Sequence, residues 1–376
     1  MSTRWSRREF VGWLGFSSLA SAGMGTSLLA ETSAPSKAKF AYVASKEGAD
    51  EGIHAYAPGA RGWRKLQTLQ SAHPVSLALA ADRTLYVVNE IDSHKGLPLG
   101  TVEAYAIEKD GTLGLLNRQH LALSAIHPQH AAVTPDGRHL VVAVRGGGAY
   151  NILPLNYDGS LGRVSAILKE VGADRTSSGR KAEPQMIAFD PEGRIVTVDS
   201  GTDRLSVLSF SEEGLTAQHR VELKAGCKPT QVAMHPSGEV AYVTHEDAVA
   251  CHSYEAASGS FSGAVHHMTA AVADTTSALK IHPSGHFLYA CERRSGLLVW
   301  NLNERGVVRR SLGLQASEMG QLSAIDLAPD GRSMVGVSRT NGTVRYAEID
   351  PGTGSVRAGR VLAHVDSPAS IVVLYS

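Results

Sequence analysis

One stretch of the chain, "IHPQHAAVTPDGRHLVVAVRGGG" (residues 126–148), gathers several side chains that could do chemistry. His127 and His130 have imidazole side chains, which can act as a general base or as metal ligands, and Arg145 could hold an anion. No HExxH pattern and no histidine spacing typical of zinc sites accompanies them. The stretch is therefore either a local catalytic cluster or one unit of a repeating scaffold that carries histidines.

The chain repeats itself, and the repeat includes this stretch. Each copy has a short strand, a turn that commonly contains Pro-x-Gly, an apolar strand and then a polar or glycine-containing segment. Proline fixes φ in the turn and glycine accepts positive φ, so such turns reverse the chain at little cost. Seven copies, the first divergent, lie about 45 to 56 residues apart: "FAYVAS" (40–45), "AADRTLYVVNE" (80–90), "TPDGRHLVVAV" (134–144), "DPEGRIVTVDS" (190–200), "HPSGEVAYVTH" (235–245), "HPSGHFLYACE" (282–292) and "APDGRSMVGVS" (328–338).

This period predicts an all-β protein, a seven-bladed β-propeller of four-stranded antiparallel blades. A single blade cannot bury both of its faces, whereas seven arranged radially bury them against one another. The C-terminal "SPASIVVLYS" (367–376) matches the first strand of a unit, which the copy at residues 40–45 lacks on its N-terminal side. We therefore expect the last strand to complete the first blade and close the ring. The alternative fold for this strand pattern is a pair of β-sandwiches.

The composition of the chain limits the classes of partner that we expect it to bind. The 376 residues include 36 basic and 36 acidic side chains, so the chain lacks the basic surface that nucleic acid or an anionic membrane would require. Cys227, Cys251 and Cys291 show no CxxC spacing, and we expect them to be buried as small core residues. An oxidising compartment would permit one disulfide among them.

The first 35 residues have the form of an export signal and linker. Paired arginines at residues 7–8 precede a moderately apolar stretch, residues 12–30, and small residues and Pro35 follow. That order is typical of a twin-arginine signal, and the apolar stretch contains too much glycine and serine for a membrane-spanning helix. We expect a bacterial protein of the periplasm or cell exterior, with no membrane span after cleavage and one propeller domain over residues 36–376. The alternative is a basic disordered terminus.

The position of a residue within the repeat indicates whether it is a candidate for the functional site. In a propeller the innermost strand of each blade lies at the axis, so the ends of these strands converge from distant parts of the chain. His235 and His282 precede Pro-Ser-Gly turns, and we expect them to cap turns or to lie on the outer rim. The polar strand ends are the better site candidates: His73, His130, Gln185, Thr230, Gln231 and Ser323 where first strands begin, and Asn89, Glu90, Arg145, His245, Glu246, Glu292, Arg293 and Arg339 after second strands.

The segment "HPQHAAVTPDGRHLVVAVRGGGAYNILPLNYDGSLG" resembles the seven-bladed propeller lactonases, the 6-phosphogluconolactonase-like family that includes the fungal muconate-lactonizing cyclases. "DPEGRIVTVDSGTDRLSVLSF" and "HPSGHFLYACERRSGLLVW" resemble two further units of that family. The resemblance extends over the chain beyond the signal, and the Gly-Gly-Gly and Gly-x-Asp-Arg units are more specific than the turns. It implies hydrolysis of a sugar lactone, or the reverse ring closure, without a metal or an organic cofactor.

The resemblance also implies roles for individual residues. His130 stands where the family has a strand-start histidine, and either His130 or Glu246 would be the general base that activates water. Glu90 stands at another family glutamate and would orient its neighbours. Arg293 matches a family arginine, and together with Arg145 it would hold the oxyanion and a substrate anion. Gln185 and Gln231, at strand starts, are expected to bind substrate.

The chain departs from the family at several of these positions. Gln185 replaces a histidine, and Arg145 with the preceding valine replaces Asn-Tyr. Residues 230–231 replace an Arg-His pair, Glu292 replaces an asparagine, and residues 323–324 replace an Arg-Asn pair. Several replacements remove cations or titratable groups, and a phosphate needs Arg or Lys at its site. The departures therefore weaken the case for a phosphorylated substrate.

Three functions fit these observations. The first is a lactone hydrolase, a monomer whose partner is a small-molecule lactone or sugar acid. The second is a catalytically degenerate propeller that binds a sugar, a cell-wall fragment or another protein, which the lost histidines favour. The third is a redox propeller with a quinone or a metal, for which the chain has no CxxCH, paired cysteines or histidine metal spacing. The lactone hydrolase is the working hypothesis.

Overall fold

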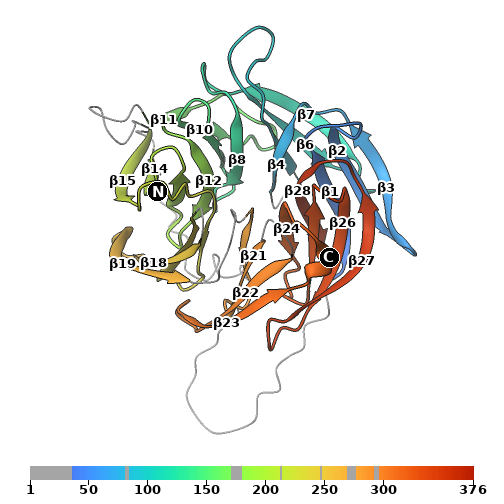
Figure 1. Cartoon of the computed structure of the whole chain (residues 1–376). Helices are drawn as coiled ribbons and strands as arrows, with labels where there is room; N and C mark the ends of the chain where they lie inside the picture. The colour runs from blue at the N-terminus through green and yellow to red at the C-terminus, as the bar shows by residue number, and fades with distance from the viewer. Residues whose placement is uncertain are drawn as a thin grey trace, which may run out of the picture.

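Short strands arranged around a central axis make up the structure (Figure 1). It is a computed structural model that describes residues 36–80, 84–170, 180–211, 214–245, 248–268, 277–291 and 296–376. The strands pair into seven four-stranded sheets, and every pair within a sheet is antiparallel. The seven-bladed β-propeller predicted from the repeats is confirmed.

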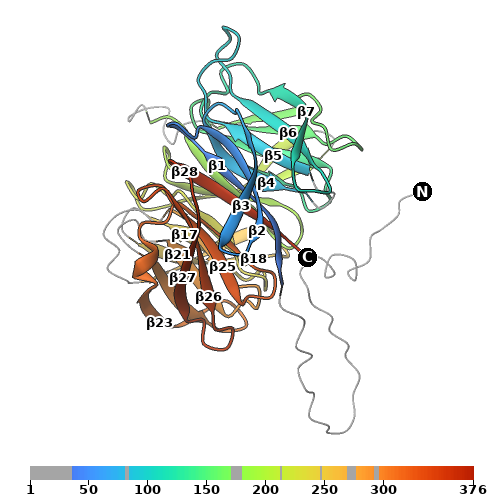
Figure 2. The same cartoon turned by 90° about the vertical axis from the view of Figure 1, so that its right-hand side faces the viewer.

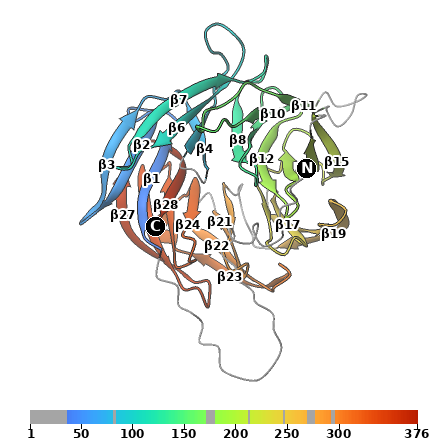
Figure 3. The same cartoon turned by 180° about the vertical axis from the view of Figure 1, so that it is seen from behind.

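In each of the first four blades, the strand named first lies next to the axis, and the other three lie successively further out in the order given (Figures 1 and 3). Blade 1 contains β28 (Pro368–Tyr375), β1 (Ala38–Ser45), β2 (Gly52–Gly59) and β3 (Gly62–Leu69). Blade 2 contains β4 (Pro74–Leu79), β5 (Thr84–Asn89), β6 (Thr101–Ile107) and β7 (Leu113–His120). Blade 3 contains β8 (Pro128–Val133), β9 (His139–Val144), β10 (Ala149–Pro154) and β11 (Ala166–Lys169). Blade 4 contains β12 (Pro184–Phe189), β13 (Ile195–Asp199), β14 (Arg204–Ser211) and β15 (Gly214–Glu222).

The remaining three blades follow the same order. Blade 5 contains β16 (Val232–Met234), β17 (Val240–Thr244), β18 (Val249–Glu255) and β19 (Ser260–Met268). Blade 6 contains β20 (Leu279–Ile281), β21 (Phe287–Cys291), β22 (Leu297–Leu302) and β23 (Val308–Gln315), followed by the short 3-10 helix η1 (Ser317–Met319). Blade 7 contains β24 (Ala324–Leu327), β25 (Ser333–Ser338), β26 (Thr343–Ile349) and β27 (Val356–His364).

The last strand closes the ring, as the sequence predicted. β28 pairs antiparallel with β1, with Val43 opposite Ile371 and Tyr42 opposite Val372 (Figure 2). This pairing gives blade 1 its fourth strand from the opposite end of the chain and covers an edge of β1 that would otherwise present unpaired N–H and C=O groups.

The core consists of the interfaces between neighbouring blades. Every residue of β5 is buried, because both faces of a blade pack against another blade. The described chain contains seven clusters of buried apolar residues, one for each pair of adjacent blades. Each large side chain fully buried there contributes roughly 1.5 to 3 kcal/mol. Stability therefore depends on all seven interfaces forming together.

A tyrosine on the second strand of four blades hydrogen-bonds to the next blade. Tyr86 Oη donates to the Gly159 carbonyl at 2.9 Å, and Tyr42 Oη donates to the Gly111 carbonyl at 3.1 Å. The other two bonds run from Tyr242 to Gly306 and from Tyr289 to Gly354. Gly111 has a φ of 88°, and a Cβ atom there would lie 2.2 Å from the Phe40 ring. The turn that receives the tyrosine thus requires glycine for both its backbone conformation and its close packing.

Two histidines also link neighbouring blades, at the same end of the propeller as these glycine turns. His235 accepts the Ser237 backbone N–H at Nδ1, 3.1 Å away, and its Nε2 lies 2.9 Å from the Gly285 carbonyl of the next blade. His282 repeats both contacts with Ser284 and Gly331. The prediction that His235 and His282 cap turns is confirmed.

Two other sequence predictions have different outcomes. Cys227, Cys251 and Cys291 are free and buried, as expected for small core residues. The export signal predicted over residues 1–35 lies outside the described residues. Among the residues that are described, no helix has the length and apolarity needed to cross a bilayer.

The tyrosine links can be tested with two matched substitutions. We expect Tyr86→Phe to lower the free energy of unfolding by about 1 to 2 kcal/mol, because it leaves the Gly159 carbonyl without its buried donor. Tyr157→Phe is the control, since Tyr157 is fully exposed and its change is expected to stay within about 0.5 kcal/mol. Urea unfolding of both variants measures the difference, and equal midpoints would contradict a role for the link in stability.

Candidate functional site at the axial rim

The predicted site residues that the structure describes lie at or near one end of the propeller, which we call the axial rim. First and second strands are antiparallel, so Pro74 lies opposite Asn89 and Pro128 lies opposite Val144. Residues that precede a first strand therefore sit beside residues that follow a second strand. The residues directly after second strands at this rim are Lys46, Glu90, Arg145, Ser200, His245 and Arg339.

Three of these residues, from three consecutive blades, form the Glu90 cluster: Lys46, Glu90 and Arg145. Lys46 Nζ lies 2.6 Å from Glu90 Oε2, and an Arg145 terminal nitrogen lies 2.8 Å from Glu90 Oε1. The Glu90 side chain is only 7% exposed, while that of Arg145 is 39% exposed. The carboxylate is thus held by two cations, and the side chain of one of them, Arg145, is partly exposed to solvent.

The backbone holds each member of the Glu90 cluster in the same way. Ser367, His73 and His127 each precede a proline and have φ of 46°, 42° and 48°. Their carbonyls accept the backbone N–H of Lys46 at 3.1 Å, of Glu90 at 2.9 Å and of Arg145 at 3.3 Å. Positive φ is unfavourable for residues other than glycine, so three blades maintain a costly conformation at the point where the cluster is attached.

Electrostatics keep Glu90 ionised. Burial alone would raise the pKa of this carboxyl group, but hydrogen bonds from Lys46 and Gln129 and the charges of Lys46 and Arg145 lower it below its usual value. Both carboxylate oxygens are occupied by the two cations. Glu90 is therefore suited to orient Lys46 and Arg145.

His130 lies on β8 next to the axis. Between neighbouring innermost strands, a side chain on one strand accepts a backbone N–H from the next strand. Ser370 Oγ accepts the Leu77 N–H at 3.3 Å, and Ser76 Oγ accepts the Ala131 N–H at 3.4 Å. In the third such contact, the backbone N–H of Ile187 donates to His130 Nδ1 at 3.4 Å. These contacts satisfy backbone groups on the free inner edges of the blades.

The contact with Ile187 fixes the hydrogen on the His130 ring. A ring nitrogen that accepts an N–H carries no hydrogen, so the neutral imidazole has its hydrogen on Nε2. Burial, with a further effect from the positive charge of Lys280, lowers the pKa of His130 to about 4. Near pH 7 the ring is therefore neutral, and Nε2 is a hydrogen-bond donor.

Two glutamines predicted from the sequence also lie at first-strand starts. Gln231 occupies the position in blade 5 that His130 occupies in blade 3; its backbone N–H donates to Thr244 Oγ1 at 2.8 Å. Gln185 Nε2 donates to Ser200 Oγ at 2.7 Å, so this amide is held at the rim of blade 4. Both side chains are partly exposed, which leaves polar atoms accessible to a ligand.

Two charged residues lie further along the axis, and the sequence did not single them out. At this strand position blades 2 to 5 carry alanines, whereas blade 6 carries Lys280 and blade 7 carries Asp326. Asp326 Oδ2 accepts the Val373 N–H at 2.7 Å. Burial raises the pKa of Asp326, against the opposing effects of Lys280 and this hydrogen bond. Lys280 is exposed, which shows that solvent reaches the axis at this depth.

The structure leaves Glu246, Glu292 and Arg293 unplaced, and it adds three residues that sequence reasoning missed: Lys46, Lys280 and Asp326. Glu246 and Arg293 lie outside the described residues, so their roles remain predictions. Lys46 could have been found by extending the divergent first repeat one residue, to the position that Glu90 and Arg145 occupy in the next two copies. The signal for Lys280 and Asp326 was their charge at a position otherwise small or apolar.

Comparison with known proteins agrees with the geometry. Residues 40–373 match the protein family described as "Lactonase, 7-bladed beta-propeller". The chain is 28% identical over 217 residues to an uncharacterised protein of Staphylococcus saprophyticus, covering 54% of this chain and 61% of that protein. It is 26% identical over 243 residues to a 6-phosphogluconolactonase of Bacillus subtilis, covering 62% of this chain and 67% of that enzyme.

A solved structure shows the same fold. The periplasmic gluconolactonase of Pseudomonas aeruginosa superposes with a TM-score of 0.77 at 23% identity, over 90% of this chain and 99% of that one. At this identity the likeness concerns the architecture.

The environment of His130 predicts how stability depends on pH. Its pKa is about 4 in the folded protein and about 6.5 when unfolded, so between these values the unfolded chain binds a proton that the folded protein does not. Folding stability therefore falls as pH drops from about 6.5 to 4. We expect the wild type to lose about 2.5 kcal/mol over this range relative to His130→Gln, which cannot titrate. Urea unfolding at several pH values measures the difference, and a gap that stays constant with pH would contradict a buried neutral imidazole.

Proposed function

The chain belongs to the seven-bladed β-propeller lactonase family, and from this premise we propose that it hydrolyses the lactone of a sugar acid at the axial rim. The observation that carries the proposal is the meeting, at and just inside this rim, of a paired cation cluster and a neutral histidine donor. The name of the Bacillus subtilis relative, a 6-phosphogluconolactonase, supports the same reaction type.

The reaction adds one water across the ring ester. The water oxygen attacks the lactone carbonyl carbon, and the carbonyl electrons move onto its oxygen. When this tetrahedral intermediate collapses, the ring C–O bond breaks, and the departing alkoxide receives the proton that the water gave up. The product is an open hydroxy acid. Catalysis requires a group that takes the water proton and donors that stabilise the oxyanion.

His130 is proposed as an oxyanion donor. Its Nδ1 accepts a backbone N–H, which leaves the Nε2–H available, and its low pKa keeps the ring neutral at physiological pH. A neutral donor with a fixed tautomer can stabilise developing negative charge without reorganisation. Gln231, at the equivalent strand position two blades away, is proposed to bind a substrate oxygen with its amide.

The proton acceptor is proposed to be Glu246, the second of the two bases inferred from sequence. Glu90 is poorly suited because its pKa is lowered and both of its oxygens are held by cations. His130 is less suited because its Nε2 carries a hydrogen in the neutral form. Arg145, oriented by Glu90, is proposed to bind an anionic or carbonyl oxygen, with Arg293 and Gln185 as further substrate contacts.

One observation favours the non-catalytic alternative, a propeller that binds a sugar or a protein. Among the described residues of the rim, Glu90 and His130 are both engaged in contacts that make them weak bases. If Glu246 does not supply the base, the same donors and cations would form a binding site for a sugar acid. Specific binding of a sugar acid without hydrolysis of any lactone would favour this alternative.

We also propose that the protein acts after export from the cytoplasm. The proposal rests on the paired arginines and the apolar stretch that follows them in residues 1–35. An exported protein would meet lactones in the periplasm or the medium rather than in central metabolism.

Hydrolysis of a panel of sugar lactones by the purified protein tests the function and the roles together. We expect His130→Ala to lower kcat/KM by about 100- to 1000-fold, the usual effect of removing an oxyanion donor. His130→Gln retains an N–H donor and is expected to keep more activity than His130→Ala. Glu246→Ala is expected to abolish turnover.

The control for these variants is His286→Ala, because His286 is an exposed histidine on the opposite side of the propeller and should leave kcat/KM unchanged. Equal loss of activity in His130→Gln and His130→Ala would indicate a base rather than a donor. No hydrolysis of any lactone by the wild type, above the spontaneous rate, would contradict the proposed function itself.

A further inference from the structure

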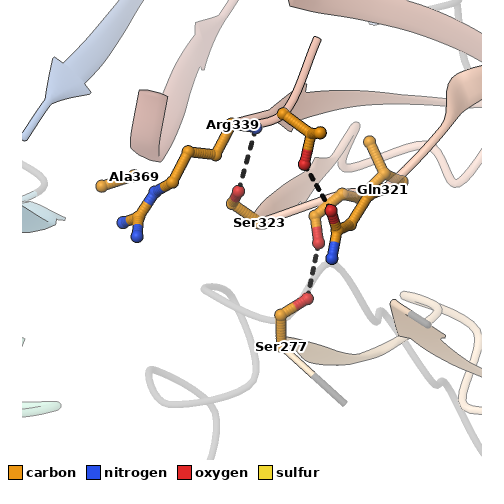
Figure 4. A pocket seen from close by; sticks show the side chains of 7 residues that line it. Ser277, Gln321, Ser323, Arg339 and Ala369 are labelled. Carbon is orange, nitrogen blue, oxygen red and sulfur yellow. Dashed lines mark hydrogen bonds between the residues drawn. The ribbon is translucent and has the colours of Figure 1, made fainter. Parts of the chain in front are cut away.

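A polar pocket lies on the axial rim, where blades 6, 7 and 1 meet (Figure 4). Its volume is about 330 Å³, and we call it the Arg339 pocket. Its polar lining consists of Ser277, Gln321, Ser323, Arg339 and Thr340. The roles carried over from the sequence resemblance include none of these five residues.

Arg339 has no carboxylate partner in the described part of the chain, and none lines its pocket. Lys46 and Arg145 share Glu90, and Arg180 pairs with buried Asp203. The backbone N–H of Arg339 donates to Ser323 Oγ at 3.1 Å, which fixes the base of the side chain. The Arg339 side chain points away from Gln321, and its guanidinium lies beside Ala369 on β28 (Figure 4). A guanidinium with free donors beside a cavity is available to a ligand.

The neighbouring polar groups leave further donors in the pocket. Thr340 Oγ1 donates to Gln321 Oε1, so the Gln321 carbonyl is satisfied and its amide hydrogens remain available. Ser323 Oγ accepts from Arg339, which leaves its own hydrogen free to donate. Ser277 Oγ donates to the Leu322 carbonyl at 2.6 Å. The described lining contains no carboxylate, so the pocket offers a positive charge and surplus donors to an acceptor.

We propose that the Arg339 pocket binds a carboxylate carried by the substrate in addition to its lactone group. The inference rests on the proposed lactone hydrolysis and makes the preferred substrate a lactone with a free acid, such as the monolactone of a sugar diacid. A planar carboxylate matches the fork of the Arg339 guanidinium, while the Gln321 amide and the Ser323 hydroxyl are available to other oxygen atoms of the same ligand. A phosphate dianion would carry more charge than this single cation balances.

The pocket and the Glu90 cluster would contact the same ligand from neighbouring blades. Arg339 follows the second strand of blade 7, and Lys46 follows the second strand of blade 1, which is next in the ring. Blade 1 also contributes Ala369, on β28, to the wall of the pocket. A sugar diacid lactone can therefore place its acid at Arg339 and its ring toward the axis.

The test compares Arg339→Gln with Arg332→Gln. Arg332 is an exposed arginine in the turn between β24 and β25, at the other end of the same blade, and serves as the matched control. Calorimetry with D-glucarate and D-gluconate measures binding of the open acids, and kcat/KM is measured for glucarolactone, gluconolactone and 6-phosphogluconolactone. We expect Arg339→Gln to weaken glucarate binding and to lower kcat/KM for glucarolactone by about 10- to 100-fold. Gluconate and gluconolactone should change less than twofold, and Arg332→Gln should match the wild type.

The two readouts separate this inference from the proposed function. Absence of glucarate binding to the wild type, or binding that Arg339→Gln leaves unchanged, overturns the carboxylate site even if lactones are hydrolysed. Arg339-dependent glucarate binding without any hydrolysis supports the site and refutes the lactonase function. A loss confined to 6-phosphogluconolactone would overturn the carboxylate assignment in favour of phosphate.

Discussion

Every blade of this propeller depends on its neighbours, because a four-stranded sheet with two apolar faces cannot be stable alone. The buried clusters of the described chain each join two adjacent blades, and in four places a tyrosine hydroxyl ties a second strand to a glycine turn of the next blade. These contacts between blades hold the strands in position around the axis. They also position the side chains of the axial rim, because these side chains directly follow the same second strands.

The packed blades hold unfavourable backbone conformations in place at the axial rim. Ser367, His73 and His127 adopt positive φ just before a proline, and their carbonyls hold the backbone of Lys46, Glu90 and Arg145. A single loop would not maintain three such conformations, whereas packed blades on either side do. The framework likewise keeps Glu90 almost buried between two cations and holds His130 against the Ile187 N–H. The charge of Glu90 and the tautomer of His130 are thereby fixed before any ligand binds.

The fold was predictable because the information is local and repeated. Each Pro-x-Gly turn and apolar strand reports its own place in a blade, and the C-terminal segment matches the strand that the first blade lacks. The turn-capping roles of His235 and His282 followed from the same register. The convergence of Glu90, Arg145, Gln185 and Gln231 on or near one rim was equally implied by the antiparallel pairing.

The pairings within the site were not predictable, because they cross between blades. One sequence does not reveal that Arg145 contacts a carboxylate whereas Arg339 contacts none among the residues that the structure describes. Nor does it reveal that a backbone N–H from blade 4 decides the tautomer of a histidine in blade 3. The most direct test of the central claim is a crystal structure with an open sugar acid, the reaction product, bound. The account predicts the product at the axial rim, with a carboxylate oxygen within hydrogen-bonding distance of His130 Nε2. A product bound elsewhere, with the rim occupied only by solvent, would contradict it.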